Sequence, residues 1–136
     1  MSEQVNYLAL FLAVIASMTI GALWYSLLAK PWMRAAGIEQ ARLSAGHTIY
    51  VYALTAFCHA LMAYVFIGVI YHAGPVTVIN GVMSALFIWG GFVMTSMIVN
   101  HRFQRRSWSL TAIDSGHYLA IMLAQGAILG WFGVKS

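Results

Sequence analysis

The sequence predicts an all-α membrane protein, with four transmembrane helices in an antiparallel bundle and a short interfacial helix in the first loop. Of the 136 residues, 62% are hydrophobic and only 7% are charged. A water-soluble domain usually has about a quarter of its residues charged. In addition, four apolar runs each reach the roughly 20 residues that a helix needs to cross a bilayer. We therefore expect a single transmembrane domain over residues 1–136.

The four spans are assigned from the positions where the apolar runs begin and end. Backbone polar groups cannot remain unpaired in lipid, and the alternation of a barrel strand is absent, so each run is predicted to be a helix. Lys30 and Pro31 end the first run, since proline cannot continue the helical hydrogen-bond ladder. A turn at residues 72–75 predicts that the second and third spans pack side by side as a hairpin. The predicted spans cover about residues 6–28, 48–72, 76–99 and 110–132.

The longest connection, residues 31–46, combines large apolar side chains with charged ones. Trp32 and Met33 beside Arg34 suit a short helix that lies at the membrane interface. Gly37 is expected to interrupt this helix. We interpret the segment as a cover over one end of the bundle.

Basic residues are confined to alternate connections, which sets the expected orientation. The second connection contains no lysine or arginine. By the positive-inside rule, the first and third loops face the cytoplasm and both termini face outward. Short basic clusters beside apolar runs indicate contact with anionic lipid, so the lipid bilayer is an expected partner and nucleic acid is not. The basic residues are Lys30, Arg34 and Arg42 in the first loop, Arg102, Arg105 and Arg106 in the third, and Lys135 near the C-terminus.

Small residues recur at every fourth position in two of the spans, and such ridges let helices approach closely. The chain also has almost no mass outside its predicted spans. We therefore predict a non-enzymatic protein that acts through helix–helix assembly, as a homo-oligomer or as an accessory subunit of a larger membrane complex. The ridge residues are Ala9, Ala13, Ser17 and Gly21 in the first span and Gly126 and Gly130 in the fourth.

Asp114 is the one acidic side chain inside a predicted span. An ionisable group at such a position is costly unless it is paired or hydrated, which makes it a candidate for function. It lies about one turn into its helix, within reach of the preceding loop. One interpretation is therefore a structural ion pair with an arginine of that loop: Arg102, Arg105 or Arg106.

The alternative interpretation gives this part of the chain a role in transport. Asp114, His117 and Gln125 share one face of the fourth span. A small-solute or ion channel or transporter could use this face as its path. Asn100, at the start of the basic loop, and His59, in the middle of the second span, are further polar candidates.

Cofactor binding is a third possibility for the same histidines. His59 and His117 on facing helices could hold haem b, which would make the chain a redox module. Apart from this alternative, no cofactor is expected. No enzyme is predicted either, because no nucleophile stands beside a base and an orienting group. No metal site is predicted, since no spacing brings Asp114 and His117 together with the other candidate ligands: His101, His47 and Asn100.

Short motifs spread over nearly the whole chain carry a family resemblance. They are residues 21–26 (GALWYS), 30–33 (KPWM), Gly37, 90–92 (GGF), Asn100, Phe103, Arg106, 113–114 (ID), 118–119 (YL) and Gly126. Together they resemble a family of small bacterial membrane proteins grouped as domain of unknown function 1761. The resemblance implies a four-span helical protein of the bacterial inner membrane. It implies no activity, so function has to be argued from the residues themselves.

Overall fold

The computed structural model describes residues 5–38 and 45–134. Within these ranges the regular structure is helical, and extended pairing is limited to one isolated bridge between Val5 and Val134. The predicted all-α class is therefore confirmed. The helices are α1 (Tyr7–Leu27), α2 (Ala29–Ala36), α3 (Ala45–Ala73), α4 (Val78–Ile88), the π-helical turn η1 (Trp89–Val93), α5 (Met94–Phe103) and α6 (Trp108–Phe132).

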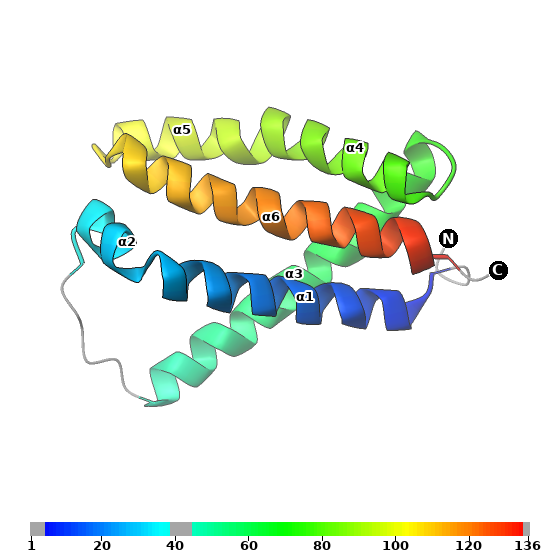
Figure 1. Cartoon of the computed structure of the whole chain (residues 1–136), viewed down its shortest axis with the longest axis horizontal. Coiled ribbons are helices and arrows are strands. Elements are labelled where there is room, and N and C mark those ends of the chain that lie inside the picture. The colour runs from blue at the N-terminus through cyan, green and yellow to red at the C-terminus, as the bar shows by residue number, and fades with distance from the viewer. Residues whose placement is uncertain (1–4, 39–44, 135–136) are drawn as a thin grey trace.

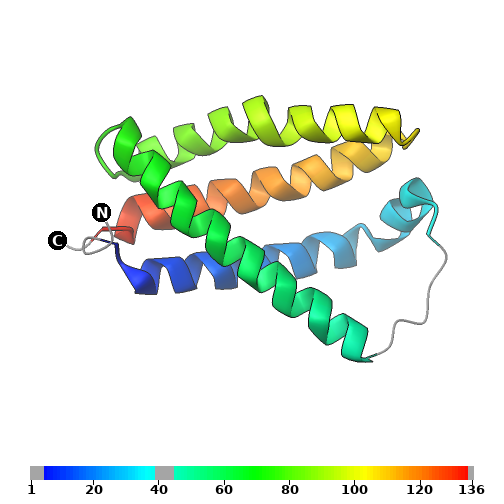
Figure 2. The same ribbon diagram turned by 180° about the vertical axis from the view of Figure 1, so that it is seen from behind.

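Three long helical segments lie side by side in one layer (Figure 1). The segment α4–η1–α5 lies on one side of α6 and α1 lies on the other, so α6 is the central helix. Helix α3 crosses one face of this layer obliquely (Figure 2). Both termini lie at one end of the layer, while α2 and the turn between α5 and α6 lie at the opposite end.

Within residues 5–38 and 45–134, three segments are long and apolar enough to cross a membrane: Tyr7–Leu27, Thr48–Ala73 and Val78–Phe103. They match the first three predicted spans. The fourth, α6, has 25 residues but is more polar. Three of its polar side chains, Ser115, His117 and Gln125, are buried. They are buried because α6 is packed between other helices.

The predicted hairpin of α3 and α4 is wrong in its packing. The two helices are joined by a tight turn, but α3 then diverges and crosses α1 and α6 (Figure 2). The surface of α4 is instead pressed against α6. Apolar side chains from the C-terminal half of α3 fill the resulting core, among them Ala63, Phe66, Ile67 and Ile70.

Proline sets the boundary between α1 and α2, as predicted, although it does so from inside α2. Pro31 is the third residue of that helix, where a missing N–H costs nothing. Its ring would clash with the carbonyl four residues earlier, at Leu27, and α1 ends at that residue. Gly37 ends α2 with a φ of 66°, a left-handed conformation that favours glycine. The predicted short helix is present, but Gly37 ends it rather than interrupting it, and residues 39–44 of the predicted segment lie outside the described part of the chain.

Candidate functional site

The Asp114 carboxylate joins three helices at one end of the layer. Its Oδ1 accepts a hydrogen bond of 2.7 Å from the hydroxyl of Tyr25, on α1, and one of 3.1 Å from the indole Nε1 of Trp32, on α2. The indole Nε1 of Trp24 also donates to the carbonyl oxygen of Ile113, over 3.0 Å. These three contacts attach the end of α1 and the start of α2 to the first turns of α6.

The ion pair expected for Asp114 is not formed within the described residues, and two of the loop arginines bind elsewhere. Nη2 of Arg102 donates to the carbonyl oxygens of Arg106 and Ser107, and its guanidinium lies 3.8 Å from the ring centroid of Trp108. Arg106 reaches across to α2 and donates to the carbonyl of Ala36 over 2.8 Å. Arg102 thus binds carbonyls of the α5–α6 turn, whereas Arg106 binds a carbonyl in the last turn of α2, where intrahelical donors are lacking.

A pocket of about 600 Å³ lies between α1, α2, α3 and α6. We call it the histidine pocket, because His59 and His117, the two histidines proposed from the sequence as haem ligands, both line it. Tyr25 and Trp32, the two hydrogen-bond donors to Asp114, also form part of its wall, whereas Asp114 does not. Its polar lining comprises Ser17, Tyr25, Ser26, Trp32, Tyr52, Thr55, His59 and His117.

The two histidines are buried, yet each has an unused ring nitrogen. His59 is 3% exposed and His117 is 7% exposed. The Nδ1 atom of each is buried and has no hydrogen-bond partner within the described residues. The ring of His117 lies against two tyrosines, with centroids 4.8 Å from Tyr25 and 5.0 Å from Tyr118. Buried polar atoms without partners are costly, and sites of this kind in a native fold call for an explanation.

Gly21 makes room for one of these imidazoles. A Cβ atom at Gly21 would lie 3.1 Å from Nε2 of His117. In the ridge of α1, Gly21 therefore allows the close approach of a side chain, that of His117, and not of another helix backbone. This contact does not test the haem b alternative, which stays a prediction.

The side chains that commonly bind metal ions lie apart from one another in the described part of the chain. Within the described residues, no three side chains of histidine, cysteine, aspartate or glutamate come close enough to share an ion. Nδ1 of His101 lies 2.8 Å from Oγ1 of Thr111 instead. The side chain of His47 falls outside the described part of the chain, as do Arg42 and Lys135.

The remaining polar candidates lie apart from Asp114. Gln125 is fully buried; its Nε2 donates to Oγ of Ser17 over 2.9 Å and to the carbonyl of His59 over 3.4 Å. It therefore joins α6 to both α1 and α3, further along the molecule. Asn100 is exposed on α5 and does not line the histidine pocket. The predicted polar face of α6 is thus divided between separate environments.

The small-residue ridges pack inside this one chain. Ala9, Ala13 and Ser17 are fully buried in the core beneath α3 and α6. Gly126 meets Gly81 of α4 so closely that a Cβ atom on Gly126 would lie 2.8 Å from the carbonyl carbon of Gly81. Gly130 similarly approaches Val78. The ridges pack closely against other helices, as predicted. Because these helices belong to the same chain, the ridges are not evidence for assembly with other chains, and such assembly stays a prediction.

Gly81 is a packing residue that the sequence interpretation missed. Gly81 and Ala85 repeat the four-residue spacing of small side chains and are both buried on α4. That spacing is the signal that could have identified them. By contrast, a Cβ on Gly90 or Gly91 would meet nothing within 4 Å. Those two glycines lie in the π-helical turn η1.

In the part of the chain that the structure describes, the fold is thus all-helical, with three segments long and apolar enough to cross a membrane and a polar pocket between its helices. A family model described as "Protein of unknown function (DUF1761)" matches residues 8–130. The chain belongs to this family, and the resemblance drawn from its motifs is confirmed. No match was found among curated proteins or among solved structures.

Proposed function

We propose that the protein is an integral membrane protein with four spans, α6 being the fourth. A helix of 25 residues is roughly 37 Å long, more than the hydrocarbon core requires. Helix α6 runs beside α1 and α4–η1–α5, both of which are apolar enough to cross (Figure 1). A central helix can carry polar side chains because its neighbours, rather than lipid, surround them.

The proposed orientation places α2 and the α5–α6 turn in the cytoplasm and both termini outside, in the inner membrane of a bacterium. Helix α2, which carries Lys30 and Arg34, lies at the same end of the layer as the end of α5 and the turn that follows it (Figure 1), which carry Arg102, Arg105 and Arg106. The termini and the uncharged α3–α4 turn share the other end. This distribution of charge supports the positive-inside assignment.

For the function we propose that the histidine pocket binds a small, polar, uncharged solute within the membrane, as a carrier or channel does. The observation that carries the proposal is the pair of buried histidines whose Nδ1 atoms face no protein partner within the described residues. Both histidines line the pocket, and a turn of each ring about its Cβ–Cγ bond would bring these buried nitrogens to a solute with hydrogen-bonding groups. Aromatic and methyl-bearing walls from Tyr25, Trp32 and Met18 would cover its apolar parts.

Asp114 has a supporting role in this proposal and does not touch the solute. By accepting hydrogen bonds from Tyr25 and Trp32, it fixes two side chains of the pocket wall. It also holds α2 over the cytoplasmic end of the pocket. We assign no chemical reaction to the site.

Native mass spectrometry of gently extracted protein tests the proposal, because it detects a bound solute of any identity by its mass. We expect the wild-type protein to carry a small-molecule adduct that the double variant His59→Phe/His117→Phe lacks. Because each imidazole leaves a buried nitrogen unpaired, the phenyl rings should not lower the melting temperature. A wild-type spectrum identical to that of a stably folded double variant would contradict the proposal.

A further inference from the structure

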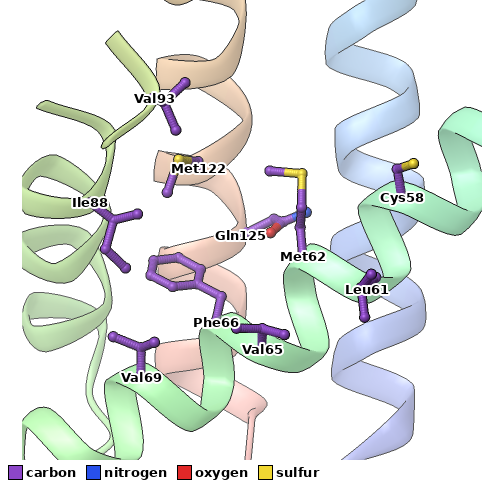
Figure 3. A pocket seen from close by; sticks show the side chains of 10 residues that line it. All are labelled: Cys58, Leu61, Met62, Val65, Phe66, Val69, Ile88, Val93, Met122 and Gln125. Atoms are coloured by element: carbon purple, nitrogen blue, oxygen red, sulfur yellow. The ribbon is translucent and has the colours of Figure 1, made fainter. Parts of the chain in front are cut away.

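A second pocket, of about 470 Å³, opens between α3, α6 and the π-helical turn region (Figure 3). We call it the apolar pocket. Its wall consists of aliphatic, aromatic and sulfur-containing side chains, with Gln125 as the one amide. Helix α3 follows α4 across a tight turn and then runs obliquely away from it (Figure 2). Among the described residues, none lines both this pocket and the histidine pocket.

Gln125 provides a polar anchor in this wall. Its side chain is 0% exposed, and both of its known hydrogen bonds are made by Nε2. Its carbonyl oxygen Oε1 is buried and has no partner within the described residues. Exchanging the two amide atoms would not help, because the carbonyl oxygen of His59 can only accept, and Oγ of Ser17 already donates to the carbonyl of Ala13. The unused group is therefore an acceptor.

We infer that the apolar pocket binds a membrane-soluble alcohol or phenol, whose hydroxyl donates to Oε1 of Gln125. An acceptor at the inner wall selects a ligand with a hydrogen-bond donor, and the remaining wall selects an uncharged apolar body. The flexible side chain of Met62, which lines the same pocket, can move to admit the hydroxyl. The inference rests on the membrane embedding proposed above, since lipid would deliver such a ligand to this face.

Cys58 supplies a native reporter for the test. It is the only cysteine of the chain, it is exposed, and it lines the apolar pocket. An occupant should therefore slow its alkylation by N-ethylmaleimide. The probes are para-hexylphenol and its methyl ether, which have nearly the same apolar body but differ in the hydroxyl donor.

In wild-type protein in detergent micelles, we expect the phenol to protect Cys58 at about five-fold lower concentration than the ether. The leucine variant Gln125→Leu should abolish this difference. Because Gln125 also joins helices, Val69→Phe serves as a second variant. Val69 is partly exposed on the pocket wall, and a phenyl ring there should block both probes.

Equal protection by phenol and ether in the wild type would overturn the role of Gln125. Absence of protection by either would overturn the pocket as a binding site. Neither result would affect the histidine pocket, which has its own lining residues and its own test. The wild-type comparison requires no variant, so a poorly folding variant cannot obscure it.

Discussion

Replacing Gly81 with alanine is expected to destabilise the protein by about 3 kcal/mol. A Cβ at this position would lie 2.7 Å from the carbonyl carbon of Gly126, and the contact is between two helix backbones. Backbone atoms cannot rotate away as a side chain can, so α4 and α6 would have to separate. Thermal or denaturant unfolding in micelles, followed by circular dichroism, measures the loss.

Gly90→Ala is the matched control for this substitution. It adds the same methyl group on the same long segment, but a Cβ there meets nothing within 4 Å. We expect unchanged or slightly higher stability, since alanine restricts the unfolded chain more than glycine does. Equal destabilisation by the two substitutions would show that the close approach of α4 and α6 does not hold the layer together.

Replacing Asp114 with leucine is the second substitution with a large expected effect. It removes the acceptor shared by the Tyr25 hydroxyl and the Trp32 indole. Two hydrogen bonds to a charged group, in a half-buried setting, together contribute about 3 kcal/mol. We expect a lower melting temperature and a changed Trp32 fluorescence as α2 loosens from α6.

Asp114→Asn separates hydrogen bonding from charge. Asparagine keeps a carbonyl oxygen at the same place, so both donors retain an acceptor, and the expected loss is only about 1 kcal/mol. The ion pair predicted from the sequence would give a different result, since asparagine would then leave an arginine unpaired and destabilise nearly as much as leucine. Similar losses for the two variants would therefore contradict the role described for Asp114.

The sequence predicted the helices well because their signals are local. Apolar length marked the segments, Pro31 separated α1 from α2, and Gly37 ended α2. The small-residue spacing of α1 also predicted a buried face. Each of these features depends on residues within a few positions of one another, because backbone hydrogen bonding and the apolar character of a segment are local properties of the chain.

The partners of the polar side chains could not be predicted in this way. Asp114 was expected to pair with arginines a few residues away, whereas Tyr25 and Trp32 are separated from it by 89 and 82 positions. Periodicity shows which face of a helix a residue occupies, but not which helix lies opposite. The oblique course of α3, which brings His59 to the same pocket as His117, depends on packing of the whole chain.

Cysteine accessibility at the histidine pocket tests the central claim, that a polar solute enters a pocket between these helices. In a Cys58→Ser background, Thr55→Cys places a thiol on the pocket wall, and Phe57→Cys places one on an exposed part of the same helix. A cationic methanethiosulfonate reagent reacts with thiolates, which form where water reaches. In native membranes we expect cysteine at 55 to react at least about ten-fold faster than cysteine at 57. Equal or slower reaction at 55 would contradict a water-connected pocket and the function proposed for it.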